Sequence, residues 1–141
     1  MSKFHTVTGS FSCPVYYEDT DFTGFVYHAN YLKFFERARE HAIGIDRLKD
    51  LYDNHDLHFV VYHADLSFLQ PAKHGDALTI RTEITFSRSP LIIAKQVAFL
   101  ENAIPGDVRA EKPIATLTID LVAVNRAGKP TRIPRHLLAV L

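Results

Sequence analysis

The residues best suited to chemistry in this chain are the carboxylates in a short run over residues 16–31. Three acids fall within four positions, Glu18, Asp19 and Asp21, and His28 follows seven residues after the last of them. A pattern typical of an amphipathic helix begins directly afterwards. Acidic side chains just ahead of a helix N-terminus place an acid or a nucleophile beside a site that favours anions. That combination suits chemistry at a carbonyl group, where negative charge develops on oxygen and aligned N–H donors stabilise it.

The helix that must position these residues is predicted over residues 29–43. Its apolar side chains recur three and four positions apart, which is the pattern of a helix with one buried face. They are Tyr31, Phe34, Phe35, Ala38, Ala42 and Ile45. Gly44 is expected to end the helix, because glycine readily adopts the conformation that closes a helix C-terminus. The polar connection over residues 46–56 leaves room for a short second helix over residues 47–52.

Five segments have the apolar, β-branched and aromatic content of strands, one before the helix and four after it. They span residues 11–18, 58–69, 76–86, 91–101 and 114–124. Pro14 should place the first strand near an edge or a bulge of the sheet, because proline has no N–H to donate. The later connections are short, as antiparallel neighbours allow, so the sequence predicts an α+β fold with one long helix against one face of an antiparallel sheet. A turn over residues 125–130 and a short helix over residues 135–141 complete the predicted order.

The bulk composition limits the classes of function. The 141 residues fit a single domain, 1–141, with a full hydrophobic core. Lysine plus arginine equals aspartate plus glutamate, 16 of each, so no overall field attracts nucleic acid or an anionic membrane. The single cysteine, Cys13, excludes an internal disulfide and fits a reducing compartment. Without a signal-like leader or an apolar run long enough to span a membrane, the chain is expected to be cytoplasmic.

Neither a metal nor a cofactor is expected. His55 and His58 flank Asp56, but no clear third ligand follows with a spacing typical of zinc sites. The sequence has no glycine-rich phosphate loop and no serine-centred nucleophile elbow.

Two segments resemble the 4-hydroxybenzoyl-CoA thioesterase family of hotdog-fold proteins. The first is YEDTDxxGxVYHANY at residues 17–31, which continues to FERAR at residues 35–39. The second is ADLxFLxPAxxGDxL at residues 64–78. Within this family the chain is most similar to the bacterial acyl-CoA thioesterases associated with the Tol–Pal system. With the order of elements, the resemblance covers nearly the whole chain.

The resemblance implies a fold, an assembly and an activity. The fold is a hotdog, in which a strongly curved antiparallel sheet of about five strands wraps around one long central helix. Two sheets join in a homodimer, which often pairs into a homotetramer, and the active sites lie at the subunit interfaces. The substrate is an acyl-CoA thioester, hydrolysed to a free acid and CoA, so CoA is part of the substrate and not a cofactor. A non-catalytic module that binds acyl-CoA or an acyl carrier protein is the main alternative, and a dehydratase-type hotdog enzyme is a weaker one.

The resemblance also implies roles for two catalytic residues and for Gly24. Asp21 has the position of the catalytic carboxylate, which could attack the thioester carbon or activate water; the sequence leaves both routes open. His28 lies near the helix N-terminus, where its backbone N–H could donate to the thioester oxygen and its side chain could orient water or substrate. Gly24 could allow close approach of the backbone to the thioester, supply a positive φ, or do both. If Asp19 and Asp21 lie close together, each should raise the pKa of the other.

Four further residues are expected to bind substrate. Tyr27 and Tyr31 are candidates for the lining of the pocket. Arg88 and Ser89, in the turn over residues 87–90, match the general position of the loop through which the family contacts CoA. The sequence leaves open whether the acyl group is a short aliphatic chain or an aromatic ring, and whether the assembly is a dimer or a tetramer.

Overall fold

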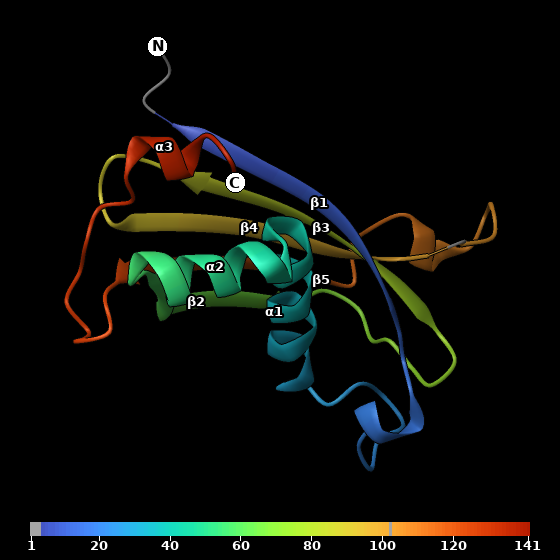
Figure 1. The fold of residues 1–141 in the computed structure, drawn as a ribbon. Helices are drawn as coiled ribbons and strands as arrows, with labels where there is room; N and C mark the ends of the chain where they lie inside the picture. Colours follow the sequence, from blue (N-terminus) through green and yellow to red (C-terminus); the bar gives the residue numbers. More distant parts are fainter. Residues whose placement is uncertain (1–3, 102) are drawn as a thin grey trace.

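Five antiparallel strands form one sheet in this protein (Figure 1). The computed structural model describes residues 4–101 and 103–141. The strands lie in the spatial order β1–β3–β4–β5–β2. Their bounds are β1 His5–Pro14, β2 His58–Phe68, β3 Ala77–Phe86, β4 Leu91–Leu100 and β5 Ala115–Val124. The predicted α+β class with an antiparallel sheet is therefore confirmed.

The two edges of the sheet are β1 and β2. β1 pairs with β3 from His5 opposite Phe86 to Pro14 opposite Ala77. The prediction that Pro14 lies near an edge is confirmed, since it is the last residue of an edge strand. The first strand nevertheless begins six residues earlier than predicted and also ends earlier. Residues Tyr17–Asp19 form a short 3₁₀ helix, η1, where the sequence suggested further strand.

Two consecutive helices pack against the sheet, so the expectation of one long central helix is not confirmed. α1 spans Asn30–Ile43 and α2 spans Ile45–His55. Gly44 separates them with a φ of 104°, a conformation that favours glycine. α2 is longer than the short helix predicted, because Ile45, Leu48 and Leu51 follow helical spacing and Leu51 is buried in the core. In Figure 1 the axis of α2 runs across that of α1.

α1 packs on β1 and β3 through a close approach at Gly9. A Cβ atom added at Gly9 would lie 2.9 Å from the Cβ of Ala42, so only glycine leaves space for the helix here. The buried face of α1 includes Tyr31, Phe34, Phe35 and Ala38, as its apolar spacing predicted.

A buried polar network also joins α1 to the sheet. Arg39 donates from Nη1 to Oε1 of Gln96 at 2.9 Å. The Gln96 amide donates in turn to the carbonyl of Phe35 at 2.8 Å and to Oγ1 of Thr82 at 2.9 Å. Burial lowers the pKa of the Arg39 guanidinium.

The remaining elements are short. η2 spans Val108–Ala110, and the C-terminal helix α3 spans Arg135–Leu138, which is shorter than predicted. Cys13 is buried in the core, as a structural cysteine would be. In the part of the chain that the structure describes, no helix is long and apolar enough to cross a membrane.

Candidate active site

A tight turn between η1 and α1 carries Asp21. The backbone N–H of Asp21 donates to the carbonyl of Phe25 at 3.0 Å, and the N–H of Gly24 donates back to the Asp21 carbonyl at 3.0 Å. Gly24 has a φ of 85°, and a Cβ added there would have no neighbour within 4 Å. The prediction of a positive φ at Gly24 is confirmed, whereas its closeness to a substrate stays a prediction.

This turn is tied to the segment that precedes β3 and to the start of α1. The N–H of Val26 donates to the Ala72 carbonyl at 2.8 Å, and Phe25 forms an isolated bridge with Lys73. The Asp19 carbonyl accepts hydrogen bonds from the Tyr27 N–H at 2.9 Å and from the Asn30 side chain at 3.0 Å. These bonds fix the turn relative to the helix N-terminus.

The Asp21 carboxylate is fully exposed in the single chain and is held at one oxygen. Its Oδ1 accepts hydrogen bonds from the Thr23 hydroxyl at 2.5 Å and from the Thr23 N–H at 2.8 Å. The second carboxylate oxygen, Oδ2, accepts no hydrogen bond from any other described residue, Thr23 included. Both Thr23 bonds stabilise the charged form and, with a smaller effect of His28, lower the pKa of Asp21.

Asp19 is not among the groups that shift the pKa of Asp21, so the mutual rise in pKa expected if the two carboxylates lay close together does not occur. The Asp19 carboxylate accepts a hydrogen bond from the Tyr16 N–H at 2.8 Å and so caps η1. Asp21 consequently stays ionised over the whole neutral pH range, as a nucleophile or a general base requires.

His28 lies two residues before the first residue of α1, close to Asp21. Among the hydrogen bonds of the described residues, none uses the His28 backbone N–H, which therefore remains available at the positive end of the helix. The His28 ring packs beside Tyr27, with ring centroids 4.5 Å apart, and edge-on to Phe68 at 6.2 Å. The structure thus brings Asp21 and His28 together.

A shallow hollow of about 360 Å³ lies beside His28. Its lining is Phe25, Val26, His28, Tyr31, Phe68, Leu69, Gln70 and Pro71. Tyr31 contributes to this hollow from a buried position, and burial raises the pKa of its hydroxyl to about 12. Tyr27 is 43% exposed beside His28. Both tyrosines therefore lie next to the candidate catalytic pair, and whether they bind substrate stays a prediction.

Arg88 and Ser89 lie far from Asp21 within one chain. Their turn joins β3 to β4 at the end of the sheet where β1 begins, whereas the Asp21 turn follows the other end of β1 (Figure 1). Ser89 stabilises its own turn, because its Oγ accepts a hydrogen bond from the Leu91 N–H at 3.0 Å. A single subunit does not bring these two residues to the candidate catalytic pair.

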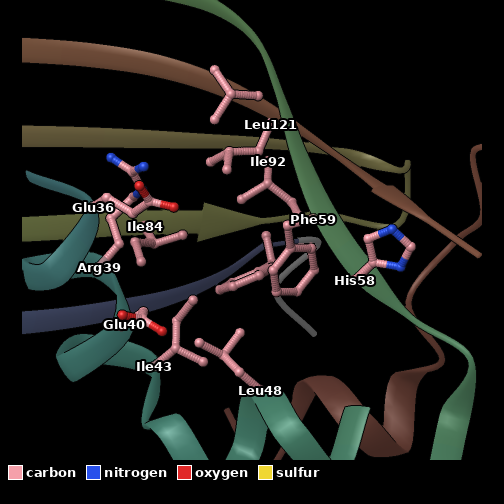
Figure 2. A pocket seen from close by; sticks show the side chains of 12 residues that line it. Glu36, Arg39, Glu40, Ile43, Leu48, His58, Phe59, Ile84, Ile92 and Leu121 are labelled. Carbon is pink, nitrogen blue, oxygen red and sulfur yellow. The ribbon is translucent and has the colours of Figure 1, made fainter. Parts of the chain in front are cut away.

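A second cavity, of about 240 Å³, lies between the C-terminal half of α1, α2 and the sheet (Figure 2). Apolar side chains supply most of its lining, including Ile43, Leu48, Phe59, Ile84, Ile92 and Leu121. Figure 2 shows Glu36, Arg39 and Glu40 entering from α1 on one side of it. The cavity begins about two helical turns beyond His28, on the opposite half of α1.

Sequence reasoning missed Thr23 and the Arg39–Gln96 network. A threonine two residues after an aspartate is common in turns, so its type carries no signal of a catalytic role. Arg39 sits among charged residues of a helix, and only its position three residues before Ala42 hints that it faces the sheet.

In the described residues no group of three or more histidine, cysteine, aspartate or glutamate side chains could hold a metal ion.

Comparison with known proteins gives consistent matches over almost the whole chain. The sequence profile of the thioesterase-like superfamily matches residues 15–141. The acyl-CoA thioesterase YbgC of Helicobacter pylori is 38% identical over 125 residues, covering 87% of this chain and 92% of that protein. The acyl-CoA thioester hydrolase YbgC of Escherichia coli is 32% identical over 127 residues, covering 89% of each chain.

Solved structures agree in fold. A probable thioesterase from Bartonella henselae is 32% identical and superposes with a TM-score of 0.75, covering 90% of this chain and 99% of its own. A 1,4-dihydroxy-2-naphthoyl-CoA thioesterase from Synechocystis superposes with a TM-score of 0.77 at 21% identity, covering 95% and 97% of the two chains. At that identity the likeness shows the fold alone.

Proposed function

This chain belongs to the thioesterase-like superfamily and is a thioester hydrolase, and from that premise we propose that it hydrolyses acyl-CoA with Asp21 as its catalytic carboxylate. The observation that carries the proposal is the pairing at the start of α1. The ionised Asp21 carboxylate, held by Thr23 through Oδ1, shares a loop with His28, whose charge acts on it and whose backbone N–H has no acceptor in the described chain. The names of the YbgC relatives supply the acyl-CoA class of the substrate.

Each group has a defined task in this reaction. The thioester carbonyl oxygen accepts a hydrogen bond from the His28 N–H, which stabilises the negative charge that develops on it. Oδ2 of Asp21 either attacks the carbonyl carbon directly or takes a proton from the water that does so. The C–S bond then breaks and the thiolate of CoA leaves, and because it is a good leaving group no strong general acid is needed. In the direct route, water afterwards hydrolyses the acyl–aspartyl anhydride to release the free acid.

We propose that two copies of the chain associate through β2. Among the described strands β2 pairs with β5 alone and so is a free edge, and none of its residues is buried. Four of its exposed side chains are large and apolar, namely Val60, Val61, Tyr62 and Phe68. Edge strands that are this long and this apolar readily pair with a second chain. The other edge strand, β1, exposes mainly serine and threonine and ends in a proline.

Antiparallel pairing of β2 with its copy would complete the active site. Phe68, at one end of β2, borders the His28 hollow, whereas Phe59 and Val61, at the other end, line the 240 Å³ cavity. A two-fold axis through the middle of the strand exchanges these ends. The His28 hollow of one subunit would then face the cavity of its partner, which supports placing the acyl group in the partner's cavity.

The size of that cavity suggests an acyl group of modest size. A volume of 240 Å³ corresponds to roughly eight water molecules at about 30 Å³ each. A chain of six to eight carbons or a single aromatic ring would be of about that size.

The same two-fold axis brings the partner's turn at Arg88 and Ser89 to the end of the sheet that holds Asp21, which supports a role of this turn in binding the phosphates of CoA.

A panel of acyl-CoA esters tests the proposed function. Acetyl-, hexanoyl-, octanoyl-, palmitoyl- and benzoyl-CoA are incubated with the purified protein, and release of free thiol is followed together with binding. We expect turnover that is highest for hexanoyl-, octanoyl- or benzoyl-CoA and falls at palmitoyl-CoA. Binding of these esters without thiol release anywhere in the panel would reject hydrolysis and favour a binding module.

A further inference from the structure

Thr23 is the only residue besides Asp21 itself whose hydrogen bonds hold the Asp21 carboxylate in the described chain. We propose that Thr23 is a positioning residue, whose hydroxyl and N–H hold Oδ1 so that Oδ2 is the oxygen presented to the thioester. The inference rests on the proposed role of Asp21 and adds the residue that orients it.

The position of Asp21 makes such an orienting contact necessary. Within its own subunit the side chain is fully exposed and emerges from a turn, so no packed neighbour of that subunit fixes its torsion angles. Phe22, the next residue, is also fully exposed and cannot support it. Free rotation of the carboxylate would spread the reactive oxygen over several orientations, whereas catalysis depends on a defined attack geometry.

The geometry of Thr23 suits this task. The two donors of Thr23 converge on the same oxygen, at 2.5 Å from the hydroxyl and 2.8 Å from the N–H. The hydroxyl oxygen also accepts a hydrogen bond from the Phe25 N–H at 3.3 Å. The threonine rotamer is thereby coupled to the backbone of the turn that the Ala72 carbonyl and Lys73 anchor.

The same contacts have an electrostatic consequence that can be measured. Both Thr23 donors favour the ionised carboxylate and lower the pKa of Asp21. The other charged group that contributes to this shift is His28, from the segment before α1, and it also lowers the pKa. Loss of the Thr23 hydroxyl should therefore raise the pKa of Asp21. As the pH is lowered, the enzyme should then lose activity at a higher pH than the unmodified protein does.

The test compares Thr23→Val, which removes the hydroxyl at nearly constant volume, with Thr23→Ser, which keeps it. Thr20→Val is the matched control, because the Thr20 hydroxyl lies in the same loop but donates to the Tyr17 carbonyl at 2.7 Å. For each variant, kcat and KM are measured against pH, together with the melting temperature. The substrate is the best ester of the acyl-CoA panel.

We expect Thr23→Val to lower kcat roughly tenfold, the scale of one hydrogen bond to a charged group, with KM changed less than about twofold. The acid limb of kcat/KM should move to higher pH, since the lost bonds had lowered the pKa of the group that must be ionised. Thr23→Ser should restore both quantities, and Thr20→Val should leave the acid limb unmoved.

Two results would overturn the inference. One is a Thr23→Val enzyme with the kcat and the acid limb of the unmodified protein. The other is an equal change in Thr20→Val, which would show that any loosening of the loop has this effect. Asp21→Asn separates the inference from the proposed function: if that variant retains turnover the role of Asp21 fails, whereas an inactive Asp21→Asn with an unaltered Thr23→Val rejects Thr23 alone.

Discussion

At the scale of residues, the proposed chemistry depends on one carboxylate and one backbone N–H that come from adjacent parts of the chain. Asp21 and His28 are seven positions apart, and the turn closed at Gly24 folds them toward each other. A backbone donor is insensitive to the identity of its own side chain. The role of the His28 N–H must therefore be tested by removing the N–H itself.

Proline at position 28 provides that test. The His28 N–H makes no hydrogen bond in the described chain, and His28 is the second residue of the turn that the Asn30 N–H closes on the Tyr27 carbonyl, a position that favours proline. We expect His28→Pro to lower kcat roughly 100-fold, the usual effect of losing one oxyanion donor. His28→Ala keeps the N–H and should lower kcat less than about tenfold. Steady-state kinetics with melting temperatures measure both, and equal rates for the two variants would contradict a role of the N–H.

Candidate residues of the site could be named from the sequence only where type and spacing, together with the resemblance to a known family, were informative, and their catalytic roles stay predictions. Asp21, Gly24 and His28 stand in an uncommon arrangement of acids, glycine and histidine before a helix, and the structure brings them together. Thr23 could not be predicted, because nothing in a turn sequence tells which carboxylate a threonine hydroxyl will reach. Whether Asp19 and Asp21 affect the pKa of each other also stayed open. The sequence shows that they are two positions apart, but not that the Asp19 carboxylate accepts a hydrogen bond from the Tyr16 N–H.

At the scale of elements, the position of α1 depends on a close contact with β1. Gly9 lies on β1 directly under Ala42 of α1, and an added methyl group would overlap the Ala42 side chain at 2.9 Å. In a strand, replacing glycine by alanine usually stabilises a protein, because it lowers the conformational entropy of the unfolded chain. At Gly9 the close contact should make the same substitution destabilising.

We expect Gly9→Ala to lower the free energy of unfolding by about 1–3 kcal/mol, the usual cost of overpacking a core contact. The double variant Gly9→Ala with Ala42→Gly should lose less than the sum of the two single variants, since it removes the overlap. Urea denaturation measures all three, with Ser10→Ala on the neighbouring position of β1 as control. An unchanged or increased stability of Gly9→Ala would show that α1 does not approach β1 this closely.

Elements with strong periodic patterns were predicted well. The four later strands agree within about one or two residues, because alternation and proline- or glycine-rich turns mark both their ends. The first strand was misplaced, because Tyr16 and Tyr17 resemble strand residues in type yet are exposed in the structure. The length of α2 was underestimated, because its buried face consists of few apolar residues within a mainly polar segment.

At the scale of the whole molecule, the isolated chain keeps the parts of the proposed site apart. Asp21 is exposed, and both the 240 Å³ cavity and the turn at Arg88 lie at the opposite end of the sheet. The distance along β2 from Phe59 to Phe68 is about 30 Å at the rise of a strand. The proposed pairing of two β2 strands would remove this separation between subunits. The resemblance to a known family implied sites at subunit interfaces, but no residue type in the sequence marks which strand would form them.

Complementation between two defective subunits tests this arrangement. Asp21→Asn removes the carboxylate, and Leu48→Trp fills the cavity from α2. We expect a co-expressed heterodimer of the two, isolated with two tags, to recover about half of the unmodified activity on octanoyl-CoA, because one of its two sites is intact. Lys49→Trp, exposed on the same helix, is the control for the tryptophan and should retain full activity. A heterodimer as inactive as its parents would reject a site shared between subunits.

The kinetics of Asp21→Asn test the central claim most directly. The substitution keeps the size of the side chain and its bonds to Thr23 but removes the charge, so we expect the fold to persist and kcat to fall more than about 100-fold. Asp53→Asn, at an exposed aspartate of α2, should match the unmodified protein in both kcat and melting temperature. Thiol release from acyl-CoA at a near-normal rate by a folded Asp21→Asn enzyme would contradict the claim that this carboxylate performs the hydrolysis.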